Sequence, residues 1–370
     1  MCYDRIMTEG ERLAWVTFSA FPLIGPKRFK VLKDYFGSAG KAWEAKEEKL
    51  LEIGFSEKLV DNFIKFRQDF DLSSYLLRLG RLKIRTLISE DKEYPENLKR
   101  TDDAPFLLYI IGEILPQDSL SLGVVGTRKI TAYGKQVTEN LVTDLTVSGL
   151  TIISGLAYGV DSVAHSVALS AGGRTIGVWA GGLDTVQDGF RRNLVEKIIK
   201  SGQGAIISEF PLGFHPNRST FPQRNRIIAG LSLGVLVTEA AEDSGSIITA
   251  NFAQKQGRPV FAVPGPITSI LSKGTADLIK KGAGLVYNVG DILGELDIKS
   301  KIKHQKSKMI LPESEDEEMV LKILENETKH IDEIARETGM ESAKVSSLLT
   351  LMEMKGKIKN LGGMVYTLFR

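Results

Sequence analysis

Between residues 120 and 290, short segments that are apolar throughout alternate with segments of helical pattern, and this alternation limits the fold more than any other feature. The apolar segments lie at residues 122–126, 150–154, 174–180, 205–208, 234–238, 259–263 and 284–287. Strands without polar alternation are buried on both faces, as in a parallel sheet that helices cover on each side. The sequence therefore predicts an α/β core, a Rossmann-like doubly wound and mostly parallel sheet, whose functional groups lie beyond the carboxyl ends of its strands.

A helical pattern precedes this core and predicts an N-terminal helical domain over residues 1–82. The run Leu23-Ile24-Gly25-Pro26-Lys27-Arg28 resembles a helix-hairpin-helix turn, as in small SAM-like domains, where backbone N–H groups can bind a phosphate. A plain Gly-Pro turn is the alternative interpretation. The core domain is then expected over residues 83–298, with strand-like segments at 84–88 and 104–109 that extend the sheet at one edge.

A Lys-rich segment over residues 299–312 predicts a linker, and residues 313–370 predict a winged-helix domain. Helices are expected near 315–326, 330–337 and 342–354, followed by a hairpin that turns at Gly362-Gly363. Acidic residues fill its entrance at 313–318, and acidic runs repel phosphate. We expect a module for protein contact or dimer modulation, although Lys355, Lys357 and Lys359 on the wing oppose this interpretation.

Composition excludes several classes of protein. Cys2 is the only cysteine and the four histidines show no ligand spacing, so we predict no disulfide framework and no metal site. The N-terminus lacks a signal peptide's apolar core, and no apolar run reaches the length of a membrane helix. The sequence thus predicts a cytoplasmic protein. Its net charge of +2 favours no partner, so a nucleic-acid surface would have to come from local clustering of charge.

Small and hydroxyl residues follow nearly every predicted core strand. They lie at residues 126–134, 154–161, 181–184, 244–250 and 264–266. Glycines let a ligand approach the backbone, and Ser, Thr and helix N-termini can hold phosphate oxygens. Neither the P-loop nor the Gly-x-Gly-x-x-Gly signature is present, so ATP and NAD are disfavoured and no cofactor is predicted.

Basic residues cluster at the same places, with aromatic residues among them. They are Arg128, Lys129, Arg191, Arg192, Arg218, Arg224 and Arg226, interleaved with Phe214 and Phe221. Single-stranded nucleic acid needs this combination, because charge follows its backbone while rings stack on its bases. Two alternatives stay open: Phe221 as a hydrophobic staple over the helix start, and Arg224 or Arg226 paired with Glu209 or Glu239. We expect at least one such pair, since cations at a helix N-terminus oppose the dipole.

Catalytic patterns are weak. Ser154, Asp161 and His165 lack a nucleophile elbow, so we expect Asp161 to complement the start of a helix and His165 to pack on it. Asp184 and Asp188 have no further carboxylate near enough in sequence to support a metal.

Taken together, these motifs resemble the DNA-processing protein A family (DprA, also called Smf). The matching pieces are Gly126-Thr127-Arg128 with Tyr133-Gly134, the run 154–161 with Ala164-His165, Gly181-Gly182-Leu183-Asp184, the run 221–232, Ser244-Gly245-Ser246 with Thr249-Ala250, the run 257–265, and Gly274-Thr275 with Gly282-Ala283. Their order spans the whole central domain. One departure is Thr185-Val186-Gln187-Asp188, where the family usually has an aromatic-proline pair, so that loop is expected to be reshaped.

The resemblance implies a non-catalytic protein that binds single-stranded DNA and loads RecA onto it in natural transformation (competence) or DNA recombination, and that dimerises through its core. It implies that Arg128 contacts a phosphate, that Phe221 stacks on a base, and that Arg218, Arg224 and Arg226 line or brace the groove. The DNA-binding set that we predict is Gly126, Arg128, Lys129, Ser154, Gly155, Arg218, Phe221, Arg224, Asn225, Arg226, Gly245 and Ser246.

Two other classes of function stay open. One is a nucleotide-processing enzyme similar to the lysine-decarboxylase-like phosphoribohydrolases. Pro264-Gly265-Pro266 does not supply the glycine-rich run of that family, and Glu239 does not stand in the sequence context of its catalytic glutamate. The other is a transcription factor that reads DNA with its winged helix and uses the core as a sensor.

Overall fold

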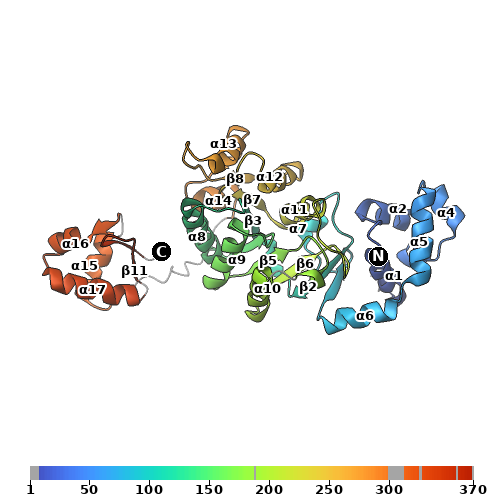
Figure 1. The fold of residues 1–370 in the computed structure, drawn as a ribbon, viewed down its shortest axis with the longest axis horizontal. Coiled ribbons are helices and arrows are strands. Elements are labelled where there is room, and N and C mark those ends of the chain that lie inside the picture. The colour runs from blue at the N-terminus through green and yellow to red at the C-terminus, as the bar shows by residue number, and fades with distance from the viewer. Residues whose placement is uncertain (1–7, 187–188, 299–311, 325–326, 356, 369–370) are drawn as a thin grey trace. The chain divides into compact units, whose positions relative to one another are not determined.

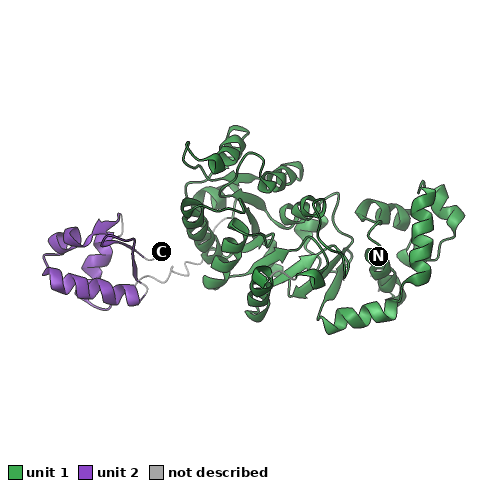
Figure 2. Ribbon diagram, in the orientation of Figure 1, with its two compact units in different colours: residues 1–299 green, residues 300–370 purple. Residues whose placement is uncertain are grey.

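The computed structural model describes residues 8–186, 189–298, 312–324, 327–355 and 357–368. The chain divides into two compact units, residues 1–299 and 300–370 (Figure 2). Most of the predicted linker, residues 299–311, lies outside the described residues, as do Cys2, Asp188 and His304.

Unit 1 is built on one large sheet (Figure 1). In the described part of the chain its strands are β1 Arg85–Ile88, β2 Leu107–Gly112, β3 Ser121–Val125, β4 Thr151–Ser154, β5 Thr175–Val178, β6 Gly204–Ser208, β7 Gly234–Val237, β8 Val260–Ala262 and β9 Gly284–Leu285. Their order is β1-β2-β6-β5-β4-β3-β7-β8-β9. Strands β3 to β9 are parallel, while β1 and β2 are antiparallel additions at one edge. The predicted doubly wound sheet and its edge extension are confirmed.

Helices cover both faces of this sheet because neighbouring strand residues point to opposite sides. Val124 and Ile152 pack with α8 (Ala132–Val147), α9 (Val160–Ser170) and α14 (Val289–Glu295). Val125 and Ile153 pack with α11 (Thr220–Leu231), α12 (Gly245–Lys255) and α13 (Lys273–Lys280). The remaining helices of this region are α7 Glu96–Lys99 and α10 Gly189–Lys200, with 3₁₀ turns at Pro116–Ser119, Leu183–Thr185 and Ile270–Ser272. Strand β3 lies between β4 and β7, which makes its carboxyl end the switch point where ligands bind in such sheets.

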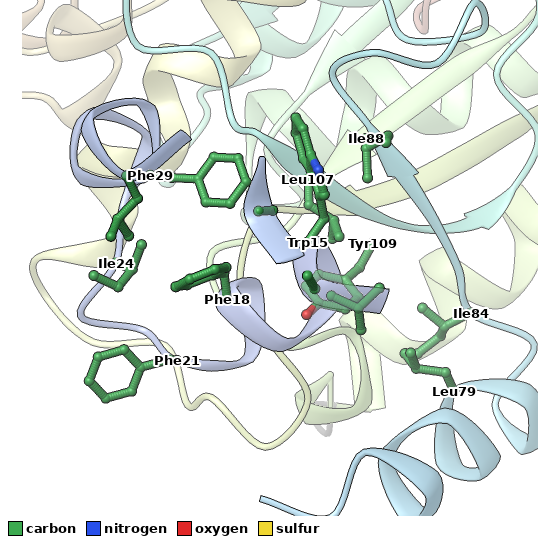
Figure 3. Close-up of a cluster of buried hydrophobic side chains, with 14 of the residues drawn as sticks. Trp15, Phe18, Phe21, Ile24, Phe29, Leu79, Ile84, Ile88, Leu107 and Tyr109 are labelled. Carbon is green, nitrogen blue, oxygen red and sulfur yellow. The ribbon is translucent and has the colours of Figure 1, made fainter. Parts of the chain in front are cut away.

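The N-terminal helices pack directly on the edge of the sheet. They are α1 Glu9–Ala20, α2 Pro26–Phe36, α3 Ala39–Trp43, α4 Glu47–Glu52, α5 Glu57–Asp69 and α6 Leu72–Arg81. Trp15, Phe18 and Phe29 share one buried cluster with Leu107 and Tyr109 of β2 (Figure 3). The domain boundary predicted at residue 82 stays a prediction, since this hydrophobic core runs across it. Helix α2 begins at the expected Gly-Pro turn, with Gly25 as its N-cap residue.

Unit 2 is a winged helix, as the sequence predicts. It contains α15 Glu315–Leu324, β10 Lys329–His330, α16 Ile331–Thr338, α17 Ser342–Met354, β11 Ile358–Asn360 and β12 Val365–Leu368. Strand β12 pairs with both β10 and β11. Gly339 ends α16 in the left-handed region, and Gly362 and Gly363 turn the β11–β12 hairpin with positive φ angles of 99° and 60°.

Within the described parts of both units, no helix combines the length and the apolar character that crossing a membrane requires.

Candidate nucleic-acid interface

A cavity of about 550 Å³ opens at the carboxyl end of β3, where the fold places its switch point. The loops after β3 and β4, the first half of α11 and the start of α12 form its walls. The cavity brings together eight of the twelve predicted residues: Gly126, Arg128, Arg218, Phe221, Arg224, Asn225, Gly245 and Ser246. Thr127, Ala157, Pro222, Asp243 and Thr249 also line it, although the sequence analysis did not select them.

Two glycines allow these loops to pack closely. A Cβ atom on Gly126 would lie 2.5 Å from the Val160 side chain and 2.8 Å from the Glu239 carbonyl oxygen. A Cβ atom on Gly155 would lie 2.4 Å from the Arg224 guanidinium. All three distances are below van der Waals contact, so these glycines are required by packing within the protein itself.

Arg224 forms the floor of the cavity and is buried. Its guanidinium donates to the Val178 carbonyl oxygen at 2.6 Å and to the Gly155 carbonyl oxygen, and Nε donates to Asn225 Oδ1 at 3.0 Å. Burial lowers the pKa of Arg224 to about 10, although the charge of Asp161 acts in the opposite direction. These bonds tie together the ends of β4 and β5, so Arg224 braces the cavity.

Asp161 and His165 have the structural roles that the sequence predicts. Asp161 lies in the first turn of α9 and accepts hydrogen bonds from the backbone N–H groups of Gly155 and Ala157 at 3.1 and 3.3 Å. Burial raises its pKa, although Arg224 lowers it. His165 is fully buried with Nδ1 2.6 Å from Thr175 Oγ1, and burial lowers its pKa to about 3.

Arg128 and Phe221 lie next to each other at the site, with Arg128 exposed and Phe221 half-buried. The Arg128 guanidinium lies 5.4 Å from the centre of the Phe221 ring, a cation–π distance. Arg128 and Arg218 are exposed, and neither forms an ion pair with a carboxylate of the described residues. Three arginines and two aspartates line the cavity, which leaves it with a positive charge.

The start of α12 adds hydrogen-bond donors. Ser244 is the N-cap residue, and its Oγ lies 3.3 Å from the Ser246 backbone nitrogen and 2.8 Å from Ser246 Oγ. Gly245 and Ser246 therefore present the N-terminus of a helix to the cavity, which favours an anion.

The structure does not bring the other four predicted residues to the cavity wall. The Ser154 hydroxyl is buried and donates to the Val124 carbonyl oxygen at 2.7 Å, because β3 and β4 are neighbours. Lys129 is exposed beside Arg128, and the Gly155 carbonyl oxygen accepts a hydrogen bond from Arg224. Arg226 points elsewhere and pairs with Glu209, with Asp103 at 3.6 Å, which confirms the expected internal ion pair.

Some partners of the motif residues have no signal in the sequence. Glu239 accepts from the Thr131 backbone N–H and hydroxyl at 2.9 and 2.7 Å rather than pairing with an arginine. Tyr158 and Phe190 stack with ring centres 4.7 Å apart, and Arg191 lies 4.9 Å from the Tyr158 ring. Aromatic spacing alone does not indicate this pair, because 32 positions separate the two rings in sequence.

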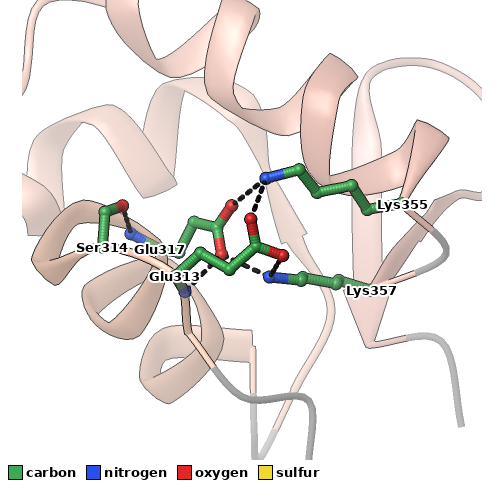
Figure 4. Close-up of polar contacts among 5 residues, drawn as sticks. All are labelled: Glu313, Ser314, Glu317, Lys355 and Lys357. Carbon is green, nitrogen blue, oxygen red and sulfur yellow. Dashed lines mark hydrogen bonds and ion pairs between the residues drawn. The ribbon is translucent and has the colours of Figure 1, made fainter.

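The lysines of the wing have carboxylate partners. Lys355 and Lys357 both bind Glu313 and Glu317, at N–O distances of 2.6–3.0 Å (Figure 4). Burial alone would raise the pKa of Glu317, but hydrogen bonds from Lys357, the Glu313 backbone and Lys355 lower it to about 2. Lys344 of α17 pairs with Asp316 at 2.7 Å. These contacts neutralise most of the positive charge that the wing would offer to DNA.

A doubly wound sheet with a cationic cavity at its switch point, followed by a winged helix, defines a Rossmann-like protein suited to binding phosphates. The chain belongs to the DNA recombination-mediator protein A family, whose model matches residues 85–297; the model of the DprA winged helix domain matches residues 306–364. Among curated relatives, Protein Smf of Escherichia coli (strain K12) is 35% identical over 336 residues, covering 87% of this chain and 88% of the relative. The DNA processing protein DprA of Bacillus subtilis (strain 168) is 42% identical over 214 residues, covering 58% of this chain and 71% of the relative.

Two solved structures are also similar. DNA processing protein A from Streptococcus pneumoniae has a TM-score of 0.66 at 33% identity and covers 78% of this chain and 99% of that chain. DNA processing protein A from Helicobacter pylori is described for its unique single-stranded DNA binding mode. Its TM-score is 0.52 at 32% identity, and the match covers 59% of this chain and 97% of that chain. Membership of a DNA-processing family is therefore shown.

Proposed function

We propose that this protein is a non-catalytic recombination mediator of the cytoplasm, which binds single-stranded DNA in the β3 cavity and loads RecA onto it. The observation that carries the proposal is the pairing of Arg128 with Phe221 at an open cavity, where a cation and a ring are both accessible. A DNA strand needs these two groups, one for its phosphate and one for a base. The binding mode described for the Helicobacter pylori relative supports the same ligand.

Each group in the cavity has a proposed role. Arg128 contacts a phosphate, assisted by Lys129 and Arg218, while Phe221 stacks on a base. Gly245 and Ser246 donate to a phosphate from the start of α12. Arg224 holds the floor together with Gly155 and Asn225, so that its contribution to DNA binding is indirect.

Titration of fluorescent oligo-dT across a salt series tests the DNA site. We expect binding without added nucleotide, and a loss of about 1.5–3 kcal/mol in Arg128→Ala, because a charge-assisted contact to phosphate disappears. The salt slope should fall by about 1 in the same variant. Arg85→Ala, which removes an exposed charge on β1, is the matched control and should bind like the wild type.

RecA loading needs its own assay. We expect the wild type to shorten the lag of RecA ATPase on DNA that is coated with single-strand binding protein, and Arg128→Ala to leave the lag unchanged. A wild type without effect on the lag would contradict loading even if DNA binding holds. Hydrolysis of nucleoside monophosphates by the same preparation would instead support the enzymatic alternative.

We further expect a homodimer through the core. Ile267 and Tyr287 are 99% and 87% exposed, and Ile270 and Leu285 are also exposed; Leu285 and Tyr287 lie in or just after the edge strand β9, and Ile267 and Ile270 lie in the segment that follows β8. Exposed apolar groups together with an unpaired strand edge favour association. Sedimentation should show a dimer for the wild type and a monomer for Ile270→Asp, whereas equal masses would contradict this surface.

A further inference from the structure

A second cavity of about 650 Å³ lies within unit 1, between the α1–α2 turn and the core. Its walls are largely apolar and carry rigid or flat groups, among them Pro22, Pro105, Phe106, Phe210 and Pro211. Apolar walls with a few converging polar groups are typical of small-ligand sites. It is distinct from the β3 cavity, because α11 presents Gln223 and Arg226 here and Phe221 and Arg224 to the β3 cavity.

The polar groups of this cavity are incompletely paired. Arg226 is only 8% exposed and binds Glu209 through Nη2, with Asp103 at 3.6 Å from Nε. Among the described residues, Arg226 Nη1 and Glu209 Oε1 are buried and have no hydrogen-bond partner. A buried donor and a buried acceptor left unpaired are costly, so a ligand that offers an acceptor next to a donor would be favoured here if these two side chains turn toward it.

The mouth of the cavity carries positive charge. Lys27 and Arg28 are exposed in the first turn of α2 and line the cavity, and Arg28 is held by the Leu23 carbonyl oxygen at 2.7 Å. Helix α2 has no side-chain cap at Gly25, so the macrodipole at this end adds to the attraction for an anion.

We propose that this second cavity binds a nucleotide. The base lies between the apolar walls, and the Arg226 and Glu209 side chains turn toward its polar edge, which donates to Glu209 Oε1 and accepts from Arg226 Nη1. The phosphate of the nucleotide meets Lys27 and Arg28. Each common base carries a donor next to an acceptor on its pairing edge, which matches the unpaired atoms of the floor. A purely apolar ligand would leave those atoms unsatisfied, and a cation would be repelled at the mouth.

The nucleotide could be a free molecule or one unit of a bound DNA strand, and the chemistry of recognition is the same. The inference goes beyond the proposed DNA site and does not depend on it. For this reason the test is made in full-length Arg128→Ala protein as well as in the wild type, since Arg128 lies only in the other cavity.

Each of the four deoxynucleoside 5′-monophosphates is titrated by calorimetry. We expect at least one to bind both proteins at a single site. Leu23→Trp, which fills the cavity mouth from an exposed position, should weaken binding by at least about tenfold, and Lys27→Ala by severalfold. Lys30→Ala, an exposed lysine of α2 that does not line the cavity, is the matched control and should bind like the wild type. Deoxyribose 5-phosphate, which lacks the base, should bind at least about tenfold more weakly.

The outcomes separate the two sources of nucleotide. Displacement of the monophosphate by oligo-dT in the wild type would assign the base to DNA, and simultaneous binding would assign a free nucleotide. The proposal is overturned if none of the four binds, if Leu23→Trp and Lys27→Ala bind like the wild type, or if deoxyribose 5-phosphate binds equally well. Failure of oligo-dT to bind would contradict the DNA site alone.

Discussion

The cations of the core cavity and those of the wing differ in their partners. Arg128 and Arg218 are exposed at the cavity without an ion pair among the described carboxylates. Lys355 and Lys357 are held by Glu313 and Glu317 in unit 2. The two regions have similar cationic side chains, yet these two wing lysines are paired with carboxylates, whereas the two core arginines are available to a phosphate. Accessible charge, rather than the number of basic residues, is therefore the basis on which we assign the proposed DNA surface to the core.

The comparison also separates two kinds of arginine in the core. Arg128 and Arg218 are available at the surface, whereas the Arg224 guanidinium donates its hydrogen bonds to carbonyl oxygens of the protein. Burying an arginine is tolerated only where its donors are paired, so Arg224 is part of the fold. The predictions below test these assignments.

The largest effect is expected for Arg224→Met. The change leaves Asp161 without its nearby cation and two buried carbonyl oxygens without a donor, so the free energy of unfolding should fall by about 3–5 kcal/mol. Urea unfolding followed by tryptophan fluorescence measures it, since Trp179 lies next to Val178. Arg218→Met is the control and should change stability by less than about 0.5 kcal/mol. Equal stability of both variants would contradict the bracing role.

The second prediction concerns the ion-pair cluster of the wing. Glu317 is 4% exposed on its side chain, and its pKa is lowered from the ordinary 4.5 to about 2. Because the folded state holds the carboxylate ionised, this stabilisation is present above pH 4.5 and is lost as the pH falls toward 2. Glu317→Gln should therefore destabilise unit 2 by about 2–3 kcal/mol at pH 7 and by much less at pH 2.

Hydrogen exchange of the amides in α15 and α17 measures this effect at both values of pH. Glu318→Gln removes an exposed carboxylate one position away and serves as the control. If the two variants exchange alike at pH 7, the cluster does not stabilise the winged helix.

The core strands could be predicted because their signal is local. A run such as residues 234–238 is apolar throughout, and so is a strand buried on both faces. The packing of Trp15 and Phe29 against β2 has no such signal, since it joins helices and a strand far apart in sequence. The order of the strands at the edge of the sheet has no local signal either, because it depends on how β2 pairs with β6.

The site was predictable as a location but less so as a set of contacts. Glycines and arginines after the strands indicated the switch point, because carboxyl ends of parallel strands share one edge. Whether a side chain faces that edge depends on its register. The hydroxyl of Ser154 donates a hydrogen bond to the Val124 carbonyl oxygen of the adjacent strand, and Arg226 lies on the other side of α11 from Phe221.

A third prediction distinguishes the two interpretations of Phe221. If the ring stacks on a base, Phe221→Ala should weaken oligo-dT binding by about 1–3 kcal/mol, while Phe221→Trp keeps binding. If the ring is a staple over the start of α11, Phe221→Ala should instead lower the unfolding midpoint and leave the affinity unchanged. Salt-series binding and urea unfolding of the same two variants decide between them.

The smallest effect is expected from the wing. Lys359 is exposed in β11, and a charge reversal there should alter oligo-dT affinity by less than about 0.5 kcal/mol, because neighbouring wing lysines are already neutralised. Arg218→Glu, the same kind of reversal in the core cavity, should weaken binding at least about tenfold, because it places a negative charge where a phosphate would lie. A comparable loss in Lys359→Glu would mean that the wing contacts DNA, and the contrast between the two regions would then fail. Retained binding in Lys359→Glu with loss in Arg218→Glu would assign the DNA to the core cavity and leave the winged helix available for a protein partner.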